Sequence, residues 1–324
     1  MKNQLSDEAV ALGEAVDDTL AAAGGVDLTR RAEADPAARA ALIGPLLEEL
    51  GLWEIEPLAD QVQLEAAAAA CRAAGRHVLA YPIAERFAAP EGSEGLLLVP
   101  STGRRVAPHA DLGLSWSAVE LTGLQRPVLS TGGSLHTKLG SFAGEVQVGE
   151  ACGTLERETA LLITLQMWWL LGVLERAGAD TLTYVKEREQ FGRTLAKFQS
   201  VQFTLTDLTV AAQSLAELAK YTLWSLAQDD HEPVWLTDAL SLRLSGLEAA
   251  DAVMRRAHQL HGAMGFADET NVSWYSRISQ PVRRLPAGLS QTEAAVVESM
   301  GTDRFTNLFT PLPSAVRPEG ALAH

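Results

Sequence analysis

Residues 188–199 of the chain read REQFGRTLAKFQ, and this stretch does most to decide the fold. Gly192 permits a tight backbone turn, and helical periodicity continues after it. The turn separates Arg188, whose forked guanidinium suits a pyrophosphate or a carboxylate, from Gln199, whose amide can donate or accept at the start of the next helix. On spacing alone, a turn between helices with a surface arginine paired to an acid is the favoured interpretation of the stretch.

A second block, residues 259–266, reads QLHGAMGF. It is expected at the end of a helix, where it begins a glycine-rich loop whose exposed backbone amides can approach an adenosine diphosphate closely. Taken by itself, a glycine-rich helix end is more often a simple C-cap. The two blocks therefore have to be interpreted together.

Together the blocks resemble two signatures of the acyl-CoA dehydrogenase family. The first matches R-x-Q-F-G-x5-F-Q, and the second matches Q-x-x-G-G-x-G-F/Y except at Ala263, where the family usually has a second glycine. The resemblance implies that this chain contacts the pyrophosphate and ADP end of an FAD seated in a neighbouring subunit. The FAD-binding residues that it implies are Arg188, Phe191, Gln199, Gln259, Gly262 and Ala263.

Composition limits the classes of function. The chain has 324 residues, 47% hydrophobic and 21% charged, which is typical of a globular protein. Its formal net charge of −15 repels phosphate backbones, so nucleic-acid binding is not expected. The densest apolar run, Leu161–Val173, is shorter than a membrane span, and residues 1–10 have no apolar signal core. With only Cys71 and Cys152, we expect a cytoplasmic protein with reduced thiols.

The order of sequence patterns predicts a mainly α, acyl-CoA dehydrogenase-like fold. We expect an N-terminal helical domain over residues 1–90, in which Gly44-Pro45 kinks or splits a helix, and a shortened β segment of about four strands over residues 91–150. Residues 151–309 are expected to form a C-terminal four-helix bundle. Its helices include one with a broad apolar face around Trp169, one from near Pro233 to Leu260, and one from Gln291 to Phe309. Residues 310–324 are expected to be a flexible tail.

The residues that α,β-dehydrogenation needs are missing at the matched positions. The reaction requires a carboxylate to remove the α-proton of the thioester, and the family carries a glutamate at one of two places. The matched positions here hold Leu162 or its neighbours and the segment 285–288, which reads LPAG. Glu158 and Glu293 are displaced from them. The family's T/S-E-P-x-x-G-S-D and W-I/Y-T/S-N stretches, which line the flavin, also have no counterpart.

This pattern resembles the smaller, non-catalytic subunit of actinobacterial heteromeric acyl-CoA dehydrogenases that act on steroid-derived thioesters. The resemblance implies a heterotetramer with a full-length homologue that carries the glutamate, with an acyl-CoA as substrate and an electron-transfer flavoprotein as one candidate acceptor. An active homomer that uses Glu158 as its base and a flavin-free pseudoenzyme or scaffold remain alternatives. No metal site is expected, since His258 and His261 lack a third ligand at suitable spacing. Tyr184 is expected on the helix face of Arg188, and the Trp168–Trp169 pair is expected in the core.

Overall fold

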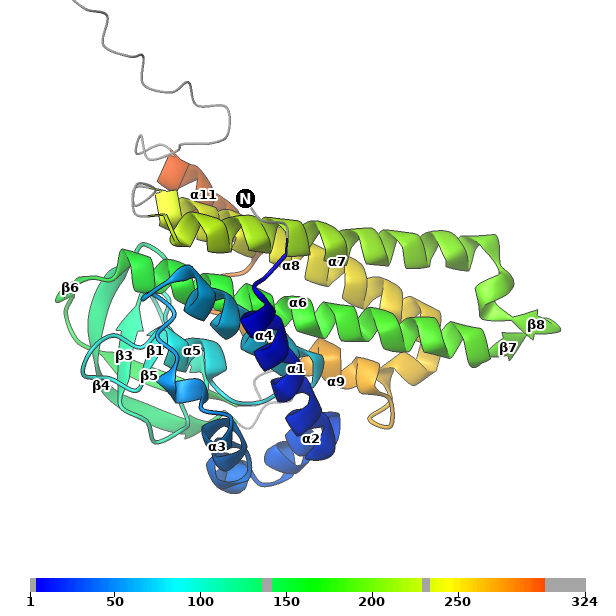
Figure 1. Ribbon diagram of the computed structural model, residues 1–324, viewed down its shortest axis with the longest axis horizontal. Helices are drawn as coiled ribbons and strands as arrows, with labels where there is room; N and C mark the ends of the chain where they lie inside the picture. Colours follow the sequence, from blue (N-terminus) through cyan, green and yellow to red (C-terminus); the bar gives the residue numbers. More distant parts are fainter. Residues whose placement is uncertain (1–3, 136–141, 229–233, 301–324) are drawn as a thin grey trace, which may run out of the picture.

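The computed structural model describes residues 4–135, 142–228 and 234–300, and the mainly α prediction is confirmed (Figure 1). A cluster of helices opens the chain, a small curled sheet follows, and long helices close it. The N-terminal helices are α1 (Asp7–Ala22), α2 (Val26–Ala34), α3 (Arg39–Glu49), α4 (Gln61–Arg76) and α5 (Ile83–Phe87). The expected helix start at Pro233, the end at Phe309 and the tail 310–324 fall outside the described residues.

Helix α3 corrects one expectation. It runs through Pro45 as one helix, instead of splitting at Gly44-Pro45. Proline removes only the bond from its own nitrogen to the carbonyl of Ala41, and Ala41 is exposed, so water can satisfy that oxygen. The helix is preceded by a 3-10 turn, Pro36–Ala38, in which the Asp35 side chain accepts from the Ala38 amide.

The sheet has six strands where about four were expected. They are β1 (Gly95–Leu98), β2 (Val106–Pro108), β3 (Trp116–Val119), β4 (Leu124–Ser134), β5 (Ala143–Val148) and β6 (Gly153–Thr154). The order is β1-β3-β4-β5-β2, with β6 paired to β4; β1 and β3 are parallel and the other pairs antiparallel. Strands β2 and β6 escaped prediction because they are only three and two residues long, too short to show alternation.

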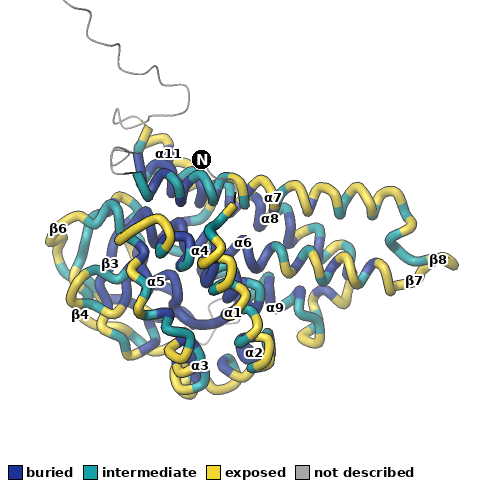
Figure 2. Tube along the Cα trace, viewed as in Figure 1, coloured by how far each residue is buried: buried dark blue, intermediate teal, exposed yellow. Residues whose placement is uncertain are grey.

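Helix α6 (Glu156–Glu187) is the axis of the molecule. It packs against α4 on one side and against α7 (Gln199–Leu226) and α8 (Trp235–His261) on the other. The shorter helices α9 (Asn271–Ile278), α10 (Gln280–Arg284) and α11 (Leu289–Ser299) complete this part of the fold. Figure 2 shows buried residues along much of α6.

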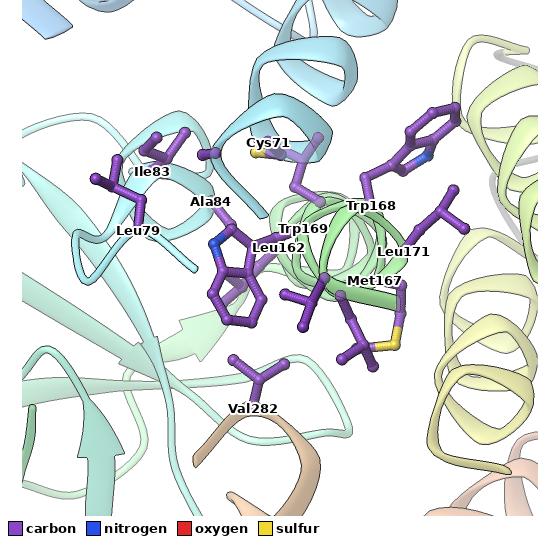
Figure 3. Packing of buried hydrophobic residues seen from close by; sticks show 14 of the residues in the cluster. Cys71, Leu79, Ile83, Ala84, Leu162, Met167, Trp168, Trp169, Leu171 and Val282 are labelled. Atoms are coloured by element: carbon purple, nitrogen blue, oxygen red, sulfur yellow. The ribbon is translucent and has the colours of Figure 1, made fainter. Parts of the chain in front are cut away.

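The sequence predicted one broad apolar face on α6, but the buried surface of this helix is wider than that face. Every residue from Thr159 to Leu174 is buried, because α6 is covered on all sides. The helix is long and apolar enough to cross a membrane, but 89% of its most apolar window is buried inside the fold, as expected for a core helix. Trp168 and Trp169 lie in the core as predicted, and in Figure 3 the Trp169 ring lies between Ala84 and Val282.

Two glycines allow α4 and α6 to touch backbone to backbone. A methyl group on Gly172 would lie 1.9 Å from the carbonyl oxygen of Arg72, and one on Gly75 would lie 1.9 Å from that of Trp169. Both distances are far below van der Waals contact. The crossing therefore requires glycine at both positions, and it fixes the N-terminal helices against the bundle.

Candidate functional site

The first sequence block forms a β-hairpin at the far end of the bundle. Strands β7 (Glu189–Gln190) and β8 (Arg193–Thr194) pair antiparallel, and both central residues of the turn have positive φ, 56° at Phe191 and 77° at Gly192. This is the two-residue hairpin turn that matches strand twist. The expected turn is present, but as a strand hairpin that projects beyond the ends of α6 and α7 (Figure 1).

The second block ends α8, as expected from the sequence. The helix stops at His261, Gly262 takes φ 58°, and the chain continues as a 3-10 helix over Gly262–Phe266 where a glycine-rich loop was expected. A positive φ at Gly262 is accessible without the penalty that a Cβ would bring. No atom lies within 4 Å of the place where that Cβ would be, so the backbone here is open to an approaching ligand.

The two blocks meet in one open pocket whose lining is part polar and part apolar. Its walls come from the ends of α6 and α8 and from the first turn of α7. Of the six predicted FAD-binding residues, four line this pocket: Arg188, Gln259, Gly262 and Ala263. The other lining residues are Tyr184, Gln190, Leu195, Ser200, Val201, Thr204, Leu260, His261 and Met264.

Phe191 and Gln199 lie beside the pocket and do not line it. The Phe191 side chain is 90% exposed at the hairpin tip, 6.2 Å from the Phe198 ring in an edge-to-face arrangement. Gln199 is the exposed first residue of α7, next to Ser200, which does line the pocket.

The electrostatics of the pocket suit an anion. Arg188 is exposed and makes no hydrogen bond or ion pair through its guanidinium with any of the described residues, so the alternative of an arginine paired to an acid finds no support there. At the start of α7 the amides of Val201 and Gln202 donate to the Phe198 carbonyl oxygen, which leaves those of Gln199 and Ser200 without an acceptor in the helix, at the positive end of a 28-residue helix dipole. Phosphates bind readily at such helix starts.

A stacked pair of rings, which no sequence pattern indicated, joins the α6 and α8 walls of the pocket. Tyr184 and His261 stack with centroids 4.3 Å apart, and the Tyr184 hydroxyl donates to the carbonyl oxygen of His261 at 3.4 Å. The His261 ring lies 2.9 Å, through Nδ1, from the Ala257 carbonyl oxygen. Arg188 directly follows the last residue of α6 and has extended backbone, so it does not share a helix face with Tyr184 as expected. Both residues line the pocket.

The positions where the family carries its base hold no carboxylate. Leu162 is fully buried in α6, and the carbonyl oxygens of Leu285 and Ala287 accept hydrogen bonds from the buried Arg243 guanidinium at 2.8 and 2.9 Å. Neither Glu158, in the first turn of α6, nor the exposed Glu293 of α11 lines the pocket. Within the described residues, no cluster of His, Cys, Asp or Glu could hold a metal ion.

Comparisons with known proteins show which family this chain resembles. Residues 164–298 match the family described as "Acyl-CoA dehydrogenase, C-terminal domain". The bovine mitochondrial short-chain specific acyl-CoA dehydrogenase is 30% identical over 128 residues, which cover 39% of this chain and 30% of that protein. The chain matches a third or less of the length of its curated relatives.

Two solved structures share the whole fold. One is a variant of the Tcur3481-Tcur3483 steroid ACAD, with a TM-score of 0.73 and 19% identity; the other is the ChsE4-ChsE5 complex from Mycobacterium tuberculosis, with a TM-score of 0.71 and 18% identity. Each alignment covers 93% of this chain and 99% of the other. Residues 164–298 therefore match the C-terminal domain of the acyl-CoA dehydrogenases, and the chain has an acyl-CoA dehydrogenase-like fold.

Proposed function

We propose that this chain is the non-catalytic subunit of a heteromeric acyl-CoA dehydrogenase. In this proposal it lends the pocket between the β7–β8 hairpin and the end of α8 to the ADP and pyrophosphate end of an FAD. The partner subunit, a full-length homologue, seats the rest of the flavin and carries the catalytic glutamate. The observation that supports this best is the convergence of two sequence blocks, about 70 residues apart, on one pocket.

The residues of the pocket fit such a ligand. Arg188 offers a charged fork without a partner among the described residues, Gln199 and Ser200 offer free amides at the start of α7, and the open backbone at Gly262 allows close approach. Ala263 adds one methyl group where the family has glycine, and Gln259 adds an amide at the opposite wall. When bound, FAD would supply the acceptor for the β-hydride; the residues of this chain would only bind and orient its diphosphate end.

The lack of a catalytic base at the two matched positions supports a partner subunit that supplies one. Leucine at position 162 and the carbonyl groups around Ala287 cannot remove an α-proton. The two solved structures described above, a steroid ACAD and a complex of two named components, make a bulky, steroid-derived acyl-CoA the favoured substrate class within this proposal. A heterotetramer, a cytoplasmic location and an electron-transfer flavoprotein as acceptor belong to the same proposal.

The test compares flavin spectra. The chain is expressed alone and together with its long homologue, and each purified sample is scanned for flavin absorbance before and after addition of an acyl-CoA. We expect a colourless chain alone and a yellow complex that the acyl-CoA bleaches. A yellow chain without the partner would instead support the active homomer, and the Glu158→Gln variant would then test Glu158 as its base. A complex that never binds flavin would support the scaffold alternative.

A further inference from the structure

One helix of the bundle presents an uncharged face to solvent. In Figure 1 the part of α7 nearest the β7–β8 hairpin runs along the upper edge of the molecule, and Figure 2 shows exposed residues recurring along it. Charged residues make up 21% of the whole chain, yet Asp207 is the single one between Gln199 and Ala216. The Asp207 carboxylate is paired with Arg256 of α8 at 3.2 Å. Within residues 199–216, all of which the structure describes, the outward face of α7 therefore carries no unpaired charge.

Apolar side chains form a ridge on this face. Phe203 and Val210 lie two helical turns apart on one side of α7, and they are 62% and 54% exposed. The polar side chains beside them are bonded to the helix itself. The hydroxyl groups of Thr206 and Thr209 donate to backbone carbonyl oxygens at 3.0 and 2.9 Å, and Gln202 Nε2 donates to another at 3.0 Å. A partner can therefore cover this ridge without leaving those donors unsatisfied.

A groove of about 680 Å³ lies between α6 and α7 and opens beside the ridge. Much of its lining is small or aliphatic and includes Gly178 and Leu182 of α6 and Ala212 of α7. The four charged residues that line it form two ion pairs of their own, Arg72 with Glu175 at 2.9 Å and Lys220 with Glu217 at 2.7 Å. The groove is therefore neutral as well as largely apolar.

The groove and the pocket proposed to hold FAD lie on opposite flanks of α7. Ser200 and Thr204 line the FAD pocket, whereas Leu205 and Thr209 line the groove. A molecule seated in the groove can therefore leave the FAD pocket open. The flavin-bearing subunit of the proposed function is assigned to the first flank, so the second flank is free for a different molecule.

Two copies of this chain complement each other across this face. Where two helices run antiparallel across a two-fold axis, each contact occurs twice, because residue i meets residue j while j meets i. An axis beside Thr206 places Phe203 opposite Val210 of the second copy. The same register brings Lys197, just before α7, opposite Glu217 of the second copy. Lys197 is exposed and makes no ion pair with any residue that the structure describes.

We propose that the ridge and the groove of α7 form a two-fold contact between two copies of this chain, in which the ridge of each copy lies in the groove of the other. The net charge of −15 makes two copies repel each other, so they can meet only where the surface is locally neutral. An exposed aromatic residue on a surface depleted of charge is also the composition of an interface core. The contact is independent of the proposed role in FAD binding.

The experiment measures self-association of the full chain alone, without flavin or the long homologue. Sedimentation velocity over a wide range of protein concentration should show a monomer–dimer equilibrium. Val210→Glu places two carboxylates in the contact and should raise the dimer Kd at least about tenfold. The same change at the exposed Val297 of α11 is the matched control and should leave the Kd unchanged. A chain that stays monomeric at every concentration, or equal effects of the two variants, would overturn the proposal.

A cysteine cross-link tests the register separately. In a Cys152→Ser background, which removes the exposed native thiol, Thr206→Cys brings two thiols together at the axis, so oxidation should give a covalent dimer. Gln213→Cys is the control, because the two copies of residue 213 would lie about 20 Å apart along the antiparallel helices, beyond the reach of a disulfide. Equal cross-linking of both variants would contradict this register.

The long homologue is the competing occupant of this face. If the chain alone forms no dimer and Val210→Glu instead abolishes binding of the long homologue, the face belongs to that subunit and the proposal is wrong. Because the measurements on the chain alone contain no flavin, their outcome is distinct from that of the flavin spectra that test the proposed function.

Discussion

Replacing Glu85 with glutamine should make the stability of this protein less sensitive to pH. Glu85 of α5 is buried, and the folded protein holds its proton up to a pKa of about 7, against an ordinary value of 4.5. Below pH 4.5 the carboxyl is neutral in both the folded and the unfolded chain, and it costs nothing. As the pH rises through this window the unfolded chain ionises first, so the free energy of unfolding falls, and above pH 7 the full penalty is present.

The size of the effect follows from the shift. A displacement of 2.5 pKa units corresponds to about 3 kcal/mol at 1.36 kcal/mol per unit, reached gradually between pH 4.5 and pH 8. Glutamine keeps the oxygen that accepts from Gln166 Nε2 but cannot ionise. The stability of Glu85→Gln relative to the wild type should therefore rise by about 2–3 kcal/mol between pH 5 and pH 8.

Urea unfolding of both proteins at pH 5, 6, 7 and 8 measures this difference, because contributions from the other ionisable groups cancel between them. The exposed Glu293→Gln serves as a control and should follow the wild type across the range. A Glu85→Gln difference that stays constant with pH, or that is least favourable at pH 8, would refute the reasoning about burial.

Three further changes test the site and the core. Arg188→Ala should leave the melting temperature of the chain unchanged, since the side chain is exposed and unpaired among the described residues. It should weaken flavin retention by the two-subunit complex about tenfold or more. Ultrafiltration of the complex measures the retained flavin, and full retention would contradict the assigned role. Gly172→Ala should destabilise the fold by about 3 kcal/mol or more because a methyl group would meet the α4 backbone, whereas Gly113→Ala, in open space, should be nearly neutral by chemical denaturation. Asp111→Ala should cost about 3–5 kcal/mol by leaving the buried Arg39, 2.6 Å away, without its counter-ion, and a cost below 1 kcal/mol would show that solvent reaches the guanidinium.

The sequence alone determined the order of the elements and the residue types of the pocket proposed to hold FAD. Helical periodicity predicted the end of α8 at Leu260 to within one residue, because the helix buries one apolar stripe. The two motif blocks identified Arg188 and Gln259 because their residue types and spacing are local properties that need no tertiary information. The missing carboxylate at Leu162 was also visible in the sequence alone.

Tertiary structure decided the rest, since it depends on which distant residues come together. Periodicity cannot tell a helix with one buried face from one that is covered on every side, and so it underestimated the burial of α6. Gly172 became essential only where α4 crosses it. Nothing in the sequence distinguishes Glu85 from the other acidic residues; packing against Gln166, 81 residues later, removes its carboxyl group from water and raises its pKa to about 7. The identity of a side chain is local, whereas its solvation is set by the whole fold.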